Sequence, residues 1–137
     1  MFIRPAILIL TIYTILLLLS CGYFENDKTE YQIEIVGNIK IHKQQSNEEN
    51  NLVYEERKDF FSVIVANCKS VYYDSSNKII FSESIVNKYN SNYYKISVTD
   101  SKSNDITSAI KKETIEKDLF FYITKQIKKK WEFDGNR

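Results

Sequence analysis

The sequence predicts an α+β fold, an antiparallel β-meander of five to seven strands with a carboxy-terminal helix packed on one face. Three observations support this prediction: the aliphatic residues are mostly β-branched, apolar and polar residues alternate along several segments, and the alternation gives way to a spacing of four near the end. The chain of 137 residues is long enough for one ordinary domain and too short for two. We expect residues 31–137 to form that single globular domain.

The aliphatic composition favours strands. After Cys21 the chain has 14 Ile and 7 Val but only 2 Leu, and branching at Cβ suits a pleated strand better than a helix. Two pairs of segments are joined by turn residues, at Gly37-Asn38 and at residues 74–77, as in β-hairpins. Alternating or apolar segments predict strands at residues 31–35, 39–41, 52–54, 60–66, 71–73, 79–81 and 93–98.

A helical pattern is predicted near the carboxy-terminal end. Apolar residues recur there every four positions, namely Ile115, Leu119, Ile123, Ile127 and Trp131. This spacing predicts a helix from about Ser108 to about Phe133, capped by Thr107 or Ser108. Acidic residues lie in its first half and lysines in its second half, an order that complements the helix dipole.

The first twenty residues have the composition of a secretory signal. Fifteen of them are apolar, and Arg4 is the one charged side chain ahead of the apolar run at residues 6–19. This run is shorter than the roughly 20 apolar residues that a membrane-spanning helix needs. The alternative is an uncleaved amino-terminal span with Arg4 on the cytoplasmic side. Either interpretation places the rest of the chain outside the cytoplasm.

The segment Leu18-Leu19-Ser20-Cys21 resembles the lipobox of bacterial lipoproteins. In that family, an aliphatic residue three positions before the cysteine and a small residue just before it are recognised by the lipoprotein signal peptidase. The resemblance implies a signal peptide at residues 1–20, an acylated Cys21 that anchors the chain to the membrane, and a polar tether at residues 21–30. Two or more acyl chains hold a protein stably on a bilayer. Gly22 resembles the pattern sorted to the outer membrane in cells with two membranes.

Charge and cysteine content exclude several classes of protein. Beyond residue 20 the charges balance, with 18 Lys or Arg against 18 Asp or Glu. Nucleic-acid-binding domains are usually strongly basic, so we expect no nucleic-acid partner. One His and two Cys exclude most metal sites and any disulfide framework, and we expect neither a metal nor a cofactor.

Cys68 is the one thiol left once Cys21 is acylated. We expect it to be a buried structural residue at the end of the strand at 60–66, because free cysteines are among the most buried residues. His42, the only histidine, is expected on the solvent-facing side of its strand. The alternative is a nucleophilic Cys68–His42 dyad, for which the sequence provides no local group that activates the thiol.

Two sets of side chains are candidates for binding. The doublets Tyr72-Tyr73 and Tyr93-Tyr94 must place one ring on each face of a strand, and exposed tyrosines are common in recognition surfaces. A basic cluster that can contact anionic headgroups consists of Lys125, Lys128, Lys129 and Lys130. The structural alternatives are that the tyrosines supply strand propensity and that the lysines complement the end of a helix.

Together these observations predict a lipid-anchored envelope lipoprotein that acts as a non-catalytic binding or accessory module, for example an inhibitor or immunity-like protein. Its partners would be the membrane, through Cys21, and an envelope or secreted protein. Beyond the leader, the body loosely resembles small envelope lipoproteins with one α+β domain. The alternatives are a structural or assembly accessory that handles lipid or envelope polymer, and an enzyme whose scattered carboxylates converge in space.

Overall fold

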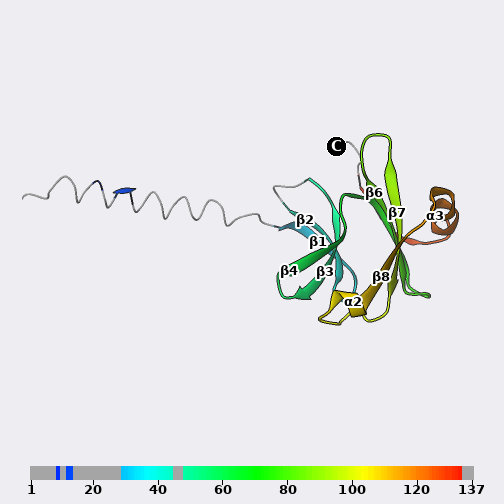
Figure 1. Ribbon diagram of the computed structural model, residues 1–137, viewed down its shortest axis with the longest axis horizontal. Coiled ribbons are helices and arrows are strands. Elements are labelled where there is room, and N and C mark those ends of the chain that lie inside the picture. The colour runs from blue at the N-terminus through cyan, green and yellow to red at the C-terminus, as the bar shows by residue number, and fades with distance from the viewer. Residues whose placement is uncertain (1–8, 10–11, 14–28, 45–47, 134–137) are drawn as a thin grey trace, which may run out of the picture.

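Two antiparallel sheets make up the structure, a computed structural model that describes residues 9, 12–13, 29–44 and 48–133 (Figure 1). The four-stranded sheet has the order β1 (Thr29–Val36), β2 (Ile39–Gln44), β3 (Asn51–Arg57) and β4 (Phe60–Val65). The five-stranded sheet has the order β8 (Ile110–Thr114), β7 (Ser91–Val98), β6 (Ile79–Ile85), β5 (Cys68–Asp74) and β9 (Lys129–Glu132). The predicted antiparallel sheet architecture is therefore confirmed in outline, with more strands than the sequence predicted.

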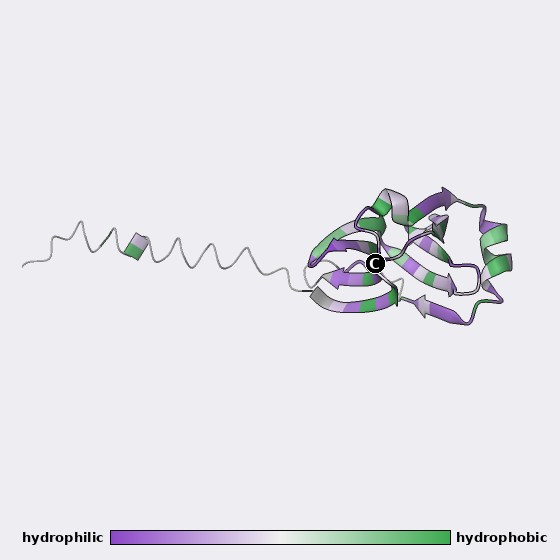
Figure 2. Ribbon diagram, turned by 90° about the horizontal axis from the view of Figure 1, so that it is seen from below, coloured by the Kyte–Doolittle hydropathy of each residue, from purple (hydrophilic) through white to green (hydrophobic). Residues whose placement is uncertain are grey.

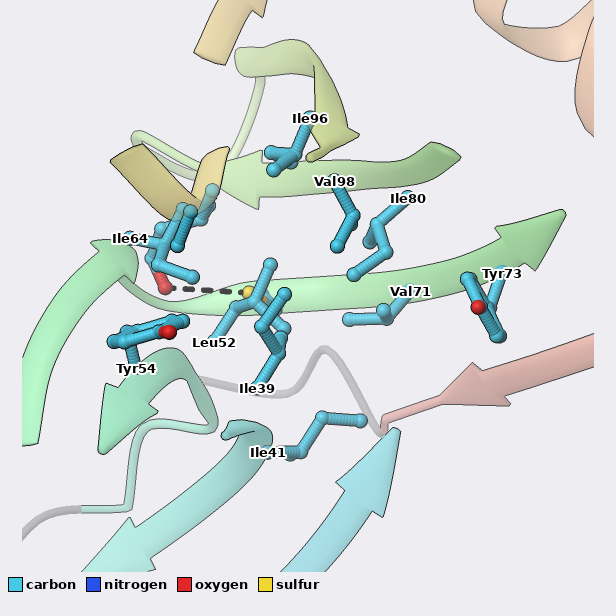
Figure 3. Packing of buried hydrophobic residues seen from close by; sticks show 13 residues of the cluster. Ile39, Ile41, Leu52, Tyr54, Ile64, Val71, Tyr73, Ile80, Ile96 and Val98 are labelled. Atoms are coloured by element: carbon cyan, nitrogen blue, oxygen red, sulfur yellow. Dashed lines mark hydrogen bonds between the residues drawn. The ribbon is translucent and has the colours of Figure 1, made fainter. Parts of the chain in front are cut away.

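The two sheets pack face to face around one hydrophobic core (Figure 3). Side chains alternate between the faces of a strand, so every second residue of the central strands points into this core. Ile39 and Ile41 of β2 meet Val71 of β5 there, and all three are fully buried. Hydrophobic and hydrophilic residues alternate along the strands (Figure 2), as expected for sheets with one face on the core.

The segment between β7 and α2 is tied to the four-stranded sheet. The backbone N–H of Asn38 donates to the carbonyl of Ser101 at 2.7 Å, and the Tyr54 hydroxyl donates to the carbonyl of Ser103 at 2.5 Å. Gly37 has a φ of +54°, and a Cβ placed there would lie 2.4 Å from the Ser101 carbonyl oxygen. The close approach therefore requires glycine at this turn.

The predicted hairpin around residues 74–77 is present between β5 and β6. Asp74 accepts hydrogen bonds from the backbone N–H groups of Ser76 and Asn77 and from the Asn77 side chain. These contacts lower the pKa of the Asp74 carboxyl, led by the Asn77 side chain. The turn residues that predicted this hairpin thus form the hydrogen bonds that stabilise its turn.

The predicted helix from about Ser108 to about Phe133 is wrong. Two short helices, α2 (Ile106–Ala109) and α3 (Lys117–Thr124), alternate here with strands β8 and β9. Residues four apart share a face of a strand as well as of a helix, so the spacing of four suits either element. Pairing of β8 with β7, and of β9 with the free edge of β5, decides between the two.

The residues of the predicted lipobox, Leu18, Leu19, Ser20 and Cys21, lie outside the described residues. Strand β1 begins at Thr29, so the last two residues assigned to the tether belong to the sheet. Among the described residues, no helix has the length and apolar character needed to cross a membrane.

Candidate functional site

Helix α3 lies on the outer face of the five-stranded sheet, away from the four-stranded sheet (Figure 1). Its contact with the sheet is centred on Phe120, which is fully buried. The ring centroid of Phe120 lies 5.8 Å from that of Tyr72 and 4.9 Å from that of Tyr93. Aromatic pairs at such distances add to the free energy gained from area burial. Phe120 therefore fixes α3 over the outer rings of β5 and β7.

An open groove of about 630 Å³ lies beside α3, and we call it the β6–β7 groove. It is bounded by the ends of β6 and β7, by the turn that joins them, and by the start of α3. Among its lining side chains are one carboxylate, three ammonium groups, three amides and three aromatic rings. They belong to Glu83, Lys69, Lys88, Lys117, Asn87, Asn90, Asn92, Tyr89, Tyr93 and Phe121.

Glu83 is the buried charge of this groove. It lies directly opposite Tyr93 in the pairing of β6 with β7, so the two side chains leave the same face of the sheet. Its side chain is only 7% exposed, and its carboxylate lies 3.9 Å from the Nζ of Lys69, whose side chain is 54% exposed. A carboxylate removed from water is costly unless it is paired and hydrogen-bonded at close range. This arrangement is unfavourable for the free energy of folding, which indicates that Glu83 has a functional role and is not present for stability.

The aromatic side of the groove is formed by Tyr93 and Phe121. Their ring centroids are 5.7 Å apart, and the two ring planes meet at 65° in an edge-on arrangement. Burial raises the pKa of the Tyr93 hydroxyl above its ordinary value of 10.0, and the negative charge of Glu83 raises it further. The phenol is therefore neutral at physiological pH and can donate a hydrogen bond.

The rim of the groove is polar and basic. Lys88 and Lys117 are exposed, and the Nζ of Lys88 lies 5.6 Å from the centre of the Tyr89 ring. The Asn87 side chain accepts hydrogen bonds from the backbone N–H groups of Tyr89 and Asn90, which fixes the turn. Three lysines face one carboxylate, so the groove holds opposite charges close together.

A second cleft of about 670 Å³ lies between the β5–β6 turn and the segment that joins α3 to β9. It brings together members of both predicted binding sets, namely Tyr73, Lys128 and Lys129. The Nζ of Lys129 lies 5.8 Å from the centre of the Tyr73 ring. The cleft contains a carboxylate only at its exposed hairpin turn, in Asp74.

The tyrosine doublets place one ring on each face of their strands, as alternation predicted. Tyr72 and Tyr93 lie on the outer face, against Phe120. Tyr73 is part of the core and Tyr94 packs against it. The outer pair is therefore partly covered by α3, and Tyr93 is the member of the four that lines the β6–β7 groove.

The predicted lysine cluster is exposed, and of its four members only Lys125, the C-cap residue of α3, lies at the end of a helix. Lys125 follows α3, Lys128 precedes β9, and Lys129 and Lys130 belong to β9. Lys130 lies 3.5 Å from the Glu132 carboxylate. The prediction that these lysines complement a helix dipole is therefore wrong for Lys128, Lys129 and Lys130, whereas contact of the cluster with anionic headgroups stays a prediction.

The prediction that His42 faces solvent is also wrong, because the residue is 6% exposed. Its ring stacks on Phe61 of β4 at a centroid distance of 4.5 Å. Cys68 is buried in the core as expected, where its thiol donates to the Val65 carbonyl and accepts from the Ser82 hydroxyl. Because Ile41 points into the core, its neighbour His42 lies on the outer face, so the structure does not bring the two members of the proposed dyad together.

Sequence reasoning missed Glu83 because scattered carboxylates normally lie on the surface. The available signal was an acidic residue between two serines inside a segment of strand character, Ser82-Glu83-Ser84. The pairing that places Glu83 beside Tyr93 depends on the register of the β6–β7 hairpin, which one sequence does not specify. In comparisons with known proteins, no family model, no curated protein and no solved structure matches the chain.

Proposed function

We propose that this protein is a lipid-anchored, extracytoplasmic binding module that recognises a charged group of an envelope component in the β6–β7 groove. One observation carries the proposal: the Glu83 side chain, which is only 7% exposed, lines an open groove while its ion pair with Lys69 spans 3.9 Å. Natural proteins keep such destabilising arrangements where function requires them. A cation on the ligand would contact the Glu83 carboxylate more closely than Lys69 does.

The anchor in this proposal is Cys21, in the segment that resembles a lipobox. Acylation there would hold residues 31–137, as one domain, beside the membrane through the tether. In a cell with two membranes, the outer membrane is the favoured site. The module would then meet envelope components at high effective concentration, which favours recognition by a small groove.

The chemistry of the described side chains supports binding rather than catalysis. Burial raises the pKa of the Cys68 thiol above its ordinary value, which disfavours the thiolate that nucleophilic catalysis needs. The sulfur hydrogen-bonds within the core, to Val65 and Ser82. Tyr93, Phe121 and the amides of the groove are side chains suited to holding a ligand.

Co-purification from detergent-solubilised envelopes of the producing cell tests this proposal. The wild-type chain should retain a defined envelope component, Glu83→Gln should lose most of it, and the matched control Glu132→Gln should retain it. Glu132 lies in the same cross-strand row as Glu83, but its side chain is 60% exposed. Equal recovery with all three chains, or no recovery with any, would overturn the binding role. Mass spectrometry of residue 21 tests the anchor separately.

A further inference from the structure

The buried Glu83 carboxylate in the β6–β7 groove favours a cationic partner. Among the described residues, the one cation within ion-pair range of Glu83 is Lys69, at 3.9 Å. Charge-assisted hydrogen bonds between ammonium and carboxylate are about 2.7–2.9 Å long. A primary ammonium can donate three hydrogen bonds, so it can satisfy a buried carboxylate at close range. The floor of the groove therefore favours a ligand ammonium group.

The aromatic side of the groove favours the same group. Tyr93 neighbours Glu83 across the strand pair, and Phe121 lies against Tyr93. Aromatic faces attract cations, most strongly where water is excluded. A cation at Glu83 would thus meet a carboxylate together with a wall that contains two rings.

The rim favours an anion at the same time. Lys69, Lys88 and Lys117 line the groove, and all three are exposed. Three lysines would repel a ligand that is only a cation, and Glu83 would repel a ligand that is only an anion. A ligand with both charges close together matches the groove. Lysine binds phosphate as a point charge, whereas arginine is favoured for bidentate recognition of carboxylate. Among the described residues that line the groove, every cationic side chain is a lysine.

Building on the proposed function, we infer that the β6–β7 groove binds a phosphorylated primary amine of the phosphoethanolamine type, with its ammonium at Glu83 and its phosphate among Lys69, Lys88 and Lys117. Two carbons and an ester oxygen separate the two charges of this group, so both fit within one groove. The ligand ammonium takes the place beside Glu83 that Lys69 holds loosely. The half-exposed Lys69 side chain then turns to the phosphate.

The probe is soluble O-phosphoethanolamine, titrated by calorimetry into the full acylated chain in dodecyl maltoside micelles. We expect a dissociation constant in about the millimolar range, as is usual for so small a ligand. Ethanolamine alone and inorganic phosphate alone should each bind at least about tenfold more weakly, because each lacks one charge-assisted contact. Affinity should fall with rising salt.

Variants locate the binding site. Glu83→Gln should weaken binding roughly tenfold or more, and Glu132→Gln should leave it within about twofold. The double variant Lys88→Ala, Lys117→Ala changes only exposed residues, so the core stays intact. This variant should also bind the probe several-fold more weakly, and its affinity should depend less on salt. Absence of binding by the wild type, equal affinity of the Glu83→Gln chain, or equal affinity for phosphate alone would overturn the inference.

Two further measurements are informative. One distinguishes a lipid from a non-lipid source of the ligand, and the other distinguishes a wrong ligand class from a wrong binding function. In phosphatidylcholine nanodiscs, added phosphatidylethanolamine should weaken binding of the soluble probe several-fold if the group is a lipid headgroup. An unchanged affinity identifies a non-lipid carrier of the same chemistry. If the probe does not bind but Glu83→Gln still loses the envelope component, the ligand class is wrong and the proposed function stands. If both measurements are negative, both proposals fail.

Discussion

Glu83 of β6 and Tyr93 of β7 are direct cross-strand partners, so a buried carboxylate and a half-buried phenol ring leave the same face of the five-stranded sheet. Helix α3 covers one side of this pair through Phe120 and Phe121, and leaves the other side open as the β6–β7 groove. A charge that is held inside a groove, rather than among packed side chains, remains within reach of a ligand.

Replacing Glu83 by Gln should leave the protein as stable as the wild type or make it more stable by up to about 1 kcal/mol. The substitution removes a costly buried charge, and the partner that it leaves, Lys69, is about half exposed to water. Urea unfolding at neutral pH measures the difference. A loss of more than about 1 kcal/mol would mean that the ion pair stabilises the fold, which contradicts its assignment to ligand binding.

Truncation of the neighbouring phenylalanines of α3 should affect stability to different extents. Phe120→Ala should cost about 3–4 kcal/mol, because it empties the contact between α3 and the sheet. Phe121 is 39% exposed, so Phe121→Ala should cost about 1 kcal/mol while weakening retention of the envelope component. Thermal unfolding combined with co-purification tests this. Equal destabilisation by both substitutions would show that the groove wall is structural.

Gly37→Ala should destabilise the protein by about 2–4 kcal/mol. Alanine would have to adopt a φ of +54°, and its Cβ would collide with Ser101, whose carbonyl oxygen and side chain lie within 2.6 Å of that position. Lys102→Ala, an exposed change in the same segment, is the control and should stay within about 0.5 kcal/mol of the wild type. A Gly37→Ala chain with wild-type unfolding behaviour would contradict the tie between this turn and residues 99–105.

His42 should make stability fall on acidification. Burial lowers its pKa below the ordinary value of 6.5, while Glu55 raises it and Lys40 lowers it to lesser extents. Below that value the unfolded chain binds more protons than the folded chain, so stability is complete above about pH 6.5 and is lost as the pH falls through the lowered pKa. Guanidinium unfolding of the wild type and of His42→Gln between pH 7.5 and about pH 5 measures this. Parallel pH profiles for the two chains would show that His42 makes no such contribution.

Local chemistry explains which parts of the fold could be predicted. The hairpin at residues 74–77 follows from Asp74 and Asn77, which bond within the turn itself. Alternation of Ile39 and Ile41 with polar residues identified a strand with one face on the core. Both signals depend on residues close together in the chain. The antiparallel sheets were predictable for that reason.

Contacts between different strands and helices explain what could not be predicted. Leu119, a member of the predicted helical stripe, is 48% exposed, while its neighbour Phe120 is buried against Tyr72 and Tyr93. His42 is buried because Phe61, on another strand, lies over it. Glu83 joins Tyr93 only through the register of β6 with β7. In each case the deciding partner lies on another strand or helix, so the residue types and spacing within one segment do not reveal it.

The most direct test of the central claim is photo-crosslinking in the producing cell from a benzoylphenylalanine at position 92. Asn92 is exposed and lines the β6–β7 groove. The same photoreactive residue at Val63, which is exposed on β4 of the other sheet, is the control. We expect a defined crosslinked envelope component from position 92 only, and loss of that product when Glu83→Gln is added. A product that forms equally from position 63, or that survives Glu83→Gln undiminished, would contradict ligand recognition in the β6–β7 groove.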